Sequence, residues 1–207
     1  TAEHNSFRGF NFATQSGRSP GSTIKPLVVY APAIEAGWSI NKTVRDQATD
    51  YNGWAPLNAD RRWHGDMPLY QALANSYNIP AINTFKSVGI QTGIAKGKQF
   101  GLNLTSKNDN LTTALGAGVE TNPWQMAQAY ATFANDGIMN DAHLIKKITN
   151  ASGQTIATAK VKSKRVIDSK TAQKMTSMML GTYTNGTGIY AAPYGYTLAG
   201  KTGTNED

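Results

Sequence analysis

The feature that most constrains the fold is an apolar run that begins at Ser22, directly after the turn Pro20-Gly21, and ends near Gly37. Its apolar residues are Leu27, Val28, Tyr30, Ala31 and Ile34. They recur with the i, i+3, i+4, i+7 spacing of one helix face. Pro26 must then lie in the first turn, where a missing N–H is tolerated best. The run therefore predicts a buried helix over 22–37.

Proline, glycine and capping residues divide the rest of the chain. The first predicted helix is 66–76, with Asp66 as its cap and Pro68 early in it. Pro80 then breaks or restarts the chain, and a helix over 81–100 is closed by Gly101. Two more helices are predicted over 122–137, starting at Asn122-Pro123 and stopped by Gly137, and over 168–180, starting at Asp168-Ser169. Alternating apolar residues predict a hairpin over 143–158 with its turn at 150–153, and a strand over 196–204. Residues 40–65 indicate a long surface connection, and residues 1–20 a polar loop.

Composition excludes several kinds of site. The 207 residues suffice for one domain with a real core, and 40% apolar residues fit a folded, globular class. The chain contains no run of about 18 apolar residues, which is the length needed to span a membrane. The chain has no cysteine, and His4, His64 and His143 are scattered without metal-ligand spacing. We therefore expect no disulfide, no metal site and no cofactor.

The net charge of +7 has two interpretations. It can be a solubilising surface, or it can attract an anion such as a carboxylate-ended substrate, an anionic wall polymer or a membrane surface. Nucleic acid fits less well, because the basic residues are dispersed and no aromatic-rich RNA-binding signature is present.

The first motif with chemical meaning is Ser22-Thr23-Ile24-Lys25. Serine is a poor nucleophile unless a base lies within hydrogen-bond reach, and a lysine three residues later shares its helix face. The start of a helix also favours a developing oxyanion. Ser39-Ile40-Asn41-Lys42 has the same form. We favour Ser22 and Lys25, because Ser22 opens an apolar helix whereas Ser39 lies in a polar connection.

Two further motifs follow in the order expected of a catalytic set. Ser76-Tyr77-Asn78 would place a hydroxyl and an amide across a cleft, although Ser39-Ile40-Asn41 and Ser106-Lys107-Asn108 also match this pattern. Lys201-Thr202-Gly203 occurs once, and supplies a cation, a hydroxyl and a close backbone approach for a substrate carboxylate. Each motif alone is weak. Their order is that of penicillin-binding proteins and class A β-lactamases.

Longer segments around these motifs resemble class A, high-molecular-weight penicillin-binding proteins. The segments are 18–26 around Ser22, 73–81 around Ser76, 126–137 as a core helix, and 199–204 around Lys201. Tyr77 stands where β-lactamases have aspartate, which favours the transpeptidase side. The resemblance covers nearly the whole chain. It implies an α+β transpeptidase fold of which residues 1–207 hold mainly the helical subdomain and part of the antiparallel sheet.

The resemblance also implies a role for each site residue. Ser22 attacks the penultimate D-alanine carbonyl of a stem peptide ending in D-Ala-D-Ala, and Lys25 accepts the serine proton. Ser76 relays a proton to the leaving amine, while Asn78 holds the substrate amide and Lys25. Lys201 organises charge. The hydroxyls of Thr202 and Thr204 bind the terminal carboxylate beside Gly203, and the N–H groups of Ser22 and Thr204 form the oxyanion hole.

The implied activity is therefore a D,D-transpeptidase that β-lactam antibiotics acylate. A D,D-carboxypeptidase or serine β-lactamase is the alternative within this chemistry. A non-catalytic β-lactam sensor or wall-binding module is the alternative of another class. The resemblance implies an extracytoplasmic site at the outer face of the bacterial cytoplasmic membrane. We expect the parent's membrane anchor, its glycosyltransferase domain and the flanking sheet strands to lie outside the chain, which would leave the strand carrying Lys201 at an unpaired edge and apolar helix faces uncovered.

Overall fold

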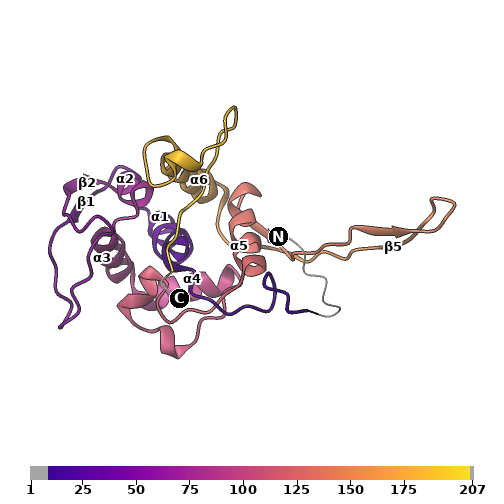
Figure 1. Ribbon diagram of the computed structural model, residues 1–207, viewed down its shortest axis with the longest axis horizontal. Helices are drawn as coiled ribbons and strands as arrows, with labels where there is room; N and C mark the ends of the chain where they lie inside the picture. Colours follow the sequence, from indigo (N-terminus) through magenta and orange to yellow (C-terminus); the bar gives the residue numbers. More distant parts are fainter. Residues whose placement is uncertain (1–8, 206–207) are drawn as a thin grey trace.

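The computed structural model describes residues 9–205 as a helical body from which a thin hairpin arm projects (Figure 1). The body surrounds a central segment that begins at Gly21. This segment packs against α3 (Asn78–Val88) and α4 (Ile90–Gln99) on one side and against α6 (Ser169–Thr184) on another. Within residues 9–205, no helix is long and apolar enough to cross a membrane.

The central segment is not the regular helix predicted over 22–37. It consists of a 3₁₀ turn (Gly21–Ile24), a π-helical turn (Pro26–Tyr30) and the short helix α1 (Ala31–Glu35). Pro26 and Pro32 lack the N–H that an α-helix would use, and the N–H of Ala31 instead reaches the carbonyl of Pro26, five residues back. The prediction of burial is confirmed, because every residue from Ile24 to Ile34 is buried.

The predicted helix over 66–76 starts three residues later. Gly65–Pro68 forms strand β2, which pairs antiparallel with β1 (Thr43–Asp46) inside the predicted connection, and α2 covers only Leu69–Ala74. Asp66 is therefore not a helix cap. It lies opposite Arg45 in the ladder, with 3.7 Å between its carboxylate and the guanidinium. Pairing with a distant strand overrides the local helix signal here.

The predicted helix over 81–100 is two helices. Gly89, with φ of 102°, separates α3 from α4. Of the break or restart expected at Pro80, the structure shows a restart, because Pro80 lies in the first turn of α3, where it needs no N–H. Two 3₁₀ turns, Ser106–Asn108 and Leu111–Leu115, follow, and the second packs against the start of the central segment.

The helices over 122–137 and 168–180 are confirmed. In α5 (Pro123–Ala134) the Asn122 side chain accepts a hydrogen bond from the N–H of Gln125, and in α6 the Asp168 side chain accepts one from Thr171. Both are side-chain caps at the starts predicted for these helices. α6 continues to Thr184, beyond the predicted end, and a last 3₁₀ turn covers Ile189–Ala191.

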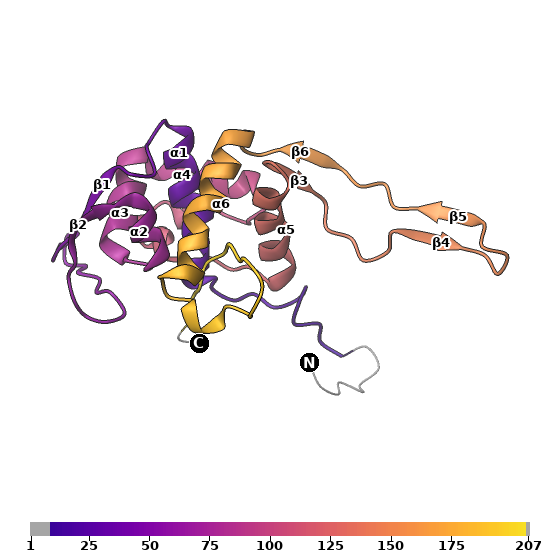
Figure 2. The same ribbon diagram turned by 90° about the horizontal axis from the view of Figure 1, so that it is seen from above.

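The hairpin predicted over 143–158 is confirmed and is the tip of the arm. At the base, β3 (Ile138–Asn140) pairs with β6 (Ser163–Arg165), and at the tip β4 (Lys147–Thr149) pairs with β5 (Thr155–Thr158). Seen from above, the arm leaves the body between α5 and α6 (Figure 2). The three two-stranded sheets are separate, so the described part of the chain is mainly helical, within an α+β fold.

The strand predicted over 196–204 is not formed. No described segment pairs with these residues, so they lack the ladder of hydrogen bonds that defines a strand. They run instead over the body, where the N–H of Gly200 reaches the carbonyl of Met179 in α6 (3.3 Å). This path still brings Lys201 to the central segment.

Candidate active site

Four segments that are distant in sequence, together with Leu115 and Thr187, line one cleft of about 890 Å³. Ser22 comes from the central segment, and Thr202–Thr204 from the end of the chain. The other two segments are the loop 57–61 and Asn75–Asn78 between α2 and α3. All the predicted site residues except Lys25 and Lys201 line this cleft, and those two lysines are buried beside it.

Glycine allows the backbone to pass close to Ser22. Gly21 has φ of 52°, and a Cβ on it would lie 2.3 Å from the carbonyl oxygen of Thr204. On the other side, a Cβ on Gly116 would lie 2.6 Å from the carbonyl oxygen of Gly21. The backbones of residues 116 and 204 therefore clamp the turn that carries Ser22, and any side chain at position 21 would open this contact.

Lys25 is fully buried at the centre of the site. Its Nζ donates to Asn78 Oδ1 (2.7 Å), to the carbonyl oxygen of Ser76 (2.7 Å) and, at 3.3 Å, to Ser76 Oγ. Its backbone N–H reaches the carbonyl of Ser22. Burial holds the pKa of Lys25 well below its ordinary value, and the neighbouring Lys201 lowers it further. A lysine in this setting can be neutral and accept a proton.

Ser76 has an unusual backbone conformation with φ of 58°. Its N–H reaches the carbonyl of Leu73, and the N–H of Tyr77 reaches that of Ala72, so the two close the end of α2 as a Schellman motif. Ser76 takes the left-handed position that glycine usually fills. This conformation presents both the carbonyl and the hydroxyl of Ser76 to Lys25.

Asn78 is the first residue of α3 and makes three hydrogen bonds. In addition to accepting from Lys25, its Nδ2 donates to the carbonyl of Leu57 (2.6 Å) and its backbone N–H donates to Asn58 Oδ1 (2.8 Å). The loop before β2 thus holds Asn78 by both its main chain and its side chain.

Lys201 is 8% exposed, and burial lowers its pKa to about 7. Its Nζ donates to the carbonyl of Thr202 (3.0 Å). The hydroxyl of Thr202 is hydrogen-bonded to that of Thr187, a cleft residue that the sequence motifs did not indicate. The edge of the cleft is therefore rich in hydroxyls next to a cation that titrates near neutral pH.

The competing motifs lie elsewhere. Ser39 is exposed, with its Oγ accepting from the N–H of Asn41, and Lys42 lies over the ring of Trp38. Ser106 is exposed in a 3₁₀ turn. Neither serine lines the cleft that contains Ser22. Asn58 was also missed, because it stands in a polar connection with no motif around it.

The comparison with protein families gives one match over nearly the whole chain. Residues 2–207 match the penicillin binding protein transpeptidase domain. Penicillin-binding protein 2a of Streptococcus pneumoniae is 56% identical over 201 residues, which are 97% of this chain and 28% of that protein. Penicillin-binding protein 1A/1B of Bacillus subtilis is 38% identical over 203 residues, 95% of this chain and 22% of that protein. The chain thus spans about a quarter of the length of these relatives.

Solved structures give the same fold. The D,D-transpeptidase domain of a peptidoglycan glycosyltransferase from Eggerthella lenta superposes with a TM-score of 0.85 at 24% identity, covering 96% of this chain and 56% of that one. Penicillin-binding protein 1A from Haemophilus influenzae superposes with a TM-score of 0.74 at 28% identity, covering 92% of this chain and 32% of that one.

Proposed function

This chain belongs to the transpeptidase domain family of penicillin-binding proteins, and from that premise we propose that it carries the catalytic residues of a D,D-transpeptidase. The observation that carries the proposal is the buried Lys25. It lies one helical turn after Ser22, and its Nζ is hydrogen-bonded to the side chains of Ser76 and Asn78. The substrate is a peptidoglycan stem peptide that ends in D-Ala-D-Ala.

In the acylation step, neutral Lys25 takes the proton of Ser22 Oγ while that oxygen attacks the penultimate D-alanine carbonyl. The peptide C–N bond then breaks, and the leaving D-alanine amine receives a proton through Ser76, which is hydrogen-bonded to Lys25. Lysine can serve as this base because its pKa is held low by burial and by Lys201. In the second step the amine of another stem peptide attacks the ester carbonyl. The bond to Ser22 Oγ breaks, and the proton lost by the amine passes to that oxygen, which frees Ser22.

Residues 201–204 recognise the substrate carboxylate. Lys201 supplies the positive field, and Thr202 and Thr204 line the cleft, where their hydroxyls donate to the carboxylate. Gly203 lets the substrate backbone approach, and the backbone N–H groups of Ser22 and Thr204 stabilise the developing oxyanion. Asn78 orients the substrate amide.

β-Lactam antibiotics acylate the same serine, because they present a carboxylate and a reactive amide in one rigid molecule.

The full-length protein acts at the outer face of the bacterial cytoplasmic membrane, with a membrane anchor and a glycosyltransferase domain outside this chain. Water as the acceptor would make the protein a carboxypeptidase or a β-lactamase. Binding without release of D-alanine would make it a sensor.

The test is intact mass spectrometry of the full-length protein after incubation with benzylpenicillin. We expect a mass increase of one antibiotic molecule, mapped to Ser22, that persists for many minutes and is absent from Ser22→Ala. Release of D-alanine from a stem peptide, with formation of a cross-linked dimer, identifies the transpeptidase. A label on Ser39, or labelling of Ser22→Ala, would refute the assignment of the nucleophile.

A further inference from the structure

Asn58 is an interior residue although it belongs to a surface loop. It is 4% exposed, and its carboxamide makes three hydrogen bonds. Its Oδ1 accepts from the N–H of Asn78 (2.8 Å), and its Nδ2 donates to Asp46 Oδ2 (2.7 Å) and to the carbonyl of Arg62 (2.8 Å). Reversing the amide would set its NH₂ against an N–H and its oxygen against two acceptors. The orientation of Asn58 is therefore determined by its partners.

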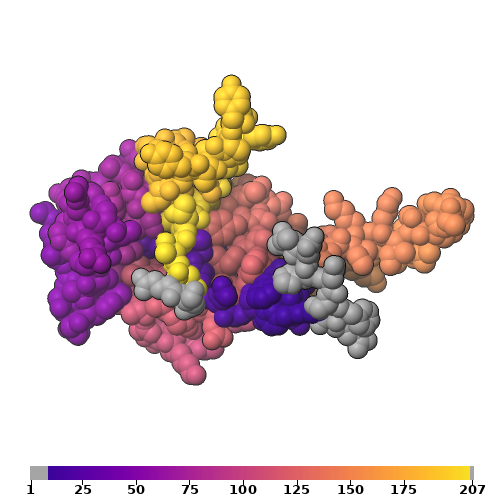
Figure 3. Space-filling model, in the orientation of Figure 1, coloured from indigo at the N-terminus to yellow at the C-terminus, as the bar shows by residue number. Residues whose placement is uncertain are grey.

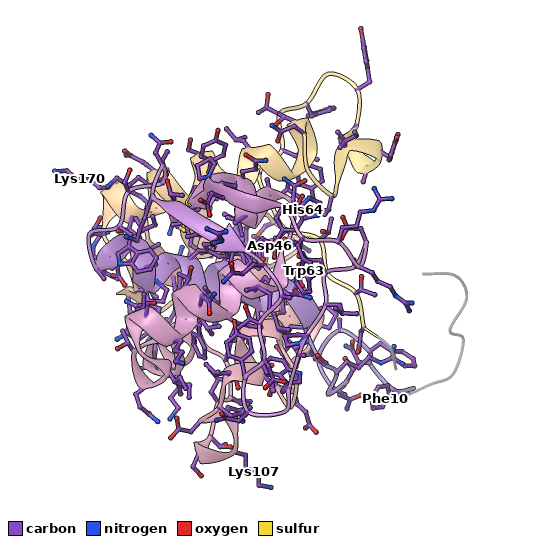
Figure 4. All side chains as sticks on the ribbon, turned by 90° about the vertical axis from the view of Figure 1, so that its left-hand side faces the viewer. Phe10, Asp46, Trp63, His64, Lys107 and Lys170 are labelled. Atoms are coloured by element: carbon purple, nitrogen blue, oxygen red, sulfur yellow. The ribbon has the colours of Figure 1, made fainter. Side chains whose placement is uncertain are left out.

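Asp46 is the anchor of this arrangement. It is the last residue of β1 and is 1% exposed. Its Oδ2 accepts from Asn58 and from the backbone N–H of His64 (3.0 Å), while its Oδ1 has no hydrogen-bond partner within residues 9–205. Figure 4 shows Asp46 beside His64, on the side of the body that faces the viewer. Burying a carboxylate with one oxygen unbonded is unfavourable, so the burial of Asp46 depends on the two hydrogen bonds that its Oδ2 accepts.

The chain of hydrogen bonds ends at the proposed base. The side chain of Tyr77, the residue before α3, makes no capping hydrogen bond. Asn58 Oδ1 instead accepts a hydrogen bond from the first N–H of the helix, that of Asn78. The neighbouring carbonyl of Leu57 accepts from Asn78 Nδ2. Asn78 Oδ1 is thereby directed at Lys25 Nζ, 2.7 Å away. Hydrogen bonds thus link Asp46, Asn58, Asn78 and Lys25 in series, with Asn78 joined to Asn58 by its main-chain N–H and to Lys25 by its side chain.

From this path we propose that Asn58, oriented by Asp46, is a positioning residue that sets the Asn78 carboxamide and, through it, the place of Lys25 relative to Ser22. The inference rests on the proposed function, since it assigns a second layer to the same acylation machinery. Asn58 lines the cleft, but every polar atom of its side chain is already used by the protein. It therefore acts on the reaction through Asn78 and not on the substrate itself.

The measurement is the rate constant of acylation by a fluorescent penicillin, together with the fraction of protein that is finally labelled. Loss of positioning lowers the rate constant while the final labelled fraction stays complete. A merely structural role lowers the labelled fraction and leaves the rate constant of the folded protein unchanged. We expect Asn58→Ala to acylate about 10- to 100-fold more slowly with a complete end point.

Asn108→Ala is the matched control. Asn108 is also an asparagine 4% exposed, and its side chain likewise bonds two backbone groups, the N–H of Thr105 and the carbonyl of Gly118, but none of its bonds goes to a site residue. We expect it to lose stability and to keep its acylation rate constant within about threefold. Equal rate constants for the two alanine variants would overturn the inference.

A second variant covers the case in which Asn58→Ala does not fold. Asp46→Asn keeps the shape of the anchor but removes the charge, and we expect it to slow acylation roughly 3- to 10-fold with a complete end point. A wild-type rate constant for Asp46→Asn would also count against the inference.

Wild-type protein labelled at Ser22 is required in every experiment. If it is never labelled, the proposed function fails; if it is labelled and the variants match it, only the positioning role fails.

Discussion

In the helical body, aliphatic side chains such as Leu73 and Ile82 are fully buried, whereas in the arm Leu144 and Ile156 are 85% and 66% exposed. Figure 3 shows the same contrast, with the arm standing away from the packed body. The arm is held by its own strand ladder, and residues of β4 and β5 are exposed on both faces. The body is therefore stabilised by contacts between distant segments, and the arm by local hydrogen bonds.

Charge differs between the two regions in the same way. Six of the chain's twenty lysines and arginines lie within residues 138–165, against one of its thirteen acidic residues. The two lysines of the site are instead buried. The net charge of the chain is thus concentrated in solvent at the arm, while the cations that matter for the proposed chemistry are those removed from solvent. Paired substitutions, one in each region, test this contrast.

The largest contrast concerns core packing. Leu73→Ala should lower the free energy of unfolding by about 2–5 kcal/mol, because it leaves a cavity among fully buried side chains. Ile156→Ala in the arm should change it by no more than about 0.5 kcal/mol. Chemical denaturation of the two variants measures both values, and similar losses would show that the arm is packed against something in solution.

The next contrast concerns lysine chemistry. Lys25→Arg places a permanently charged group that cannot give up a proton at this position, so acylation should fall by roughly 10²-fold if Lys25 is the base. Lys160→Arg makes the same change at an exposed position of the arm and should leave acylation unchanged. Near-normal labelling of Lys25→Arg would mean that this residue acts only through its charge.

A smaller contrast concerns glycine. Gly21→Ala would bring a Cβ within 2.3 Å of the Thr204 carbonyl and displace the turn that holds Ser22, so we expect acylation to fall about tenfold. Gly153 has φ of 82° with open space around it. Gly153→Ala should therefore cost about 1 kcal/mol of local hairpin stability and nothing in acylation. Rate measurements on both variants decide whether close approach, rather than backbone freedom alone, matters at position 21.

The smallest contrast is in pH dependence. In the folded protein the pKa of Lys201 is about 7, below that of an unfolded lysine near 10.4. Between these values the unfolded chain holds more protons, so the stability contributed by Lys201 rises with pH. From pH 7 to 8, wild type should gain about 1 kcal/mol relative to Lys201→Met. The exposed Lys162→Met should run parallel to wild type, and a parallel curve for Lys201→Met would contradict the low pKa.

Local sequence signals predicted the elements whose determinants lie within a few residues. Asn122 and Asp168 bind N–H groups three residues ahead, and both helices begin where these caps indicate. The turn at 150–153 closes with bonds inside its own loop. The failures involve partners that are distant in sequence. Gly65–Pro68 pairs with β1 as a strand where the sequence predicted the start of a helix. Residues 196–204 form no strand because no described segment pairs with them.

The same division applies to the site. The sequence by itself determined which residues we propose for the chemistry, because Ser22 with Lys25, Ser76 with Asn78, and Lys201 with Thr202 are each close neighbours in the chain. Only the tertiary structure decided how they meet. Lys25 bonds to residues more than fifty positions away, and its low pKa follows from burial, which no local pattern contains. Asn58 is the extreme case, since its importance arises entirely from the partners that folding brings to it.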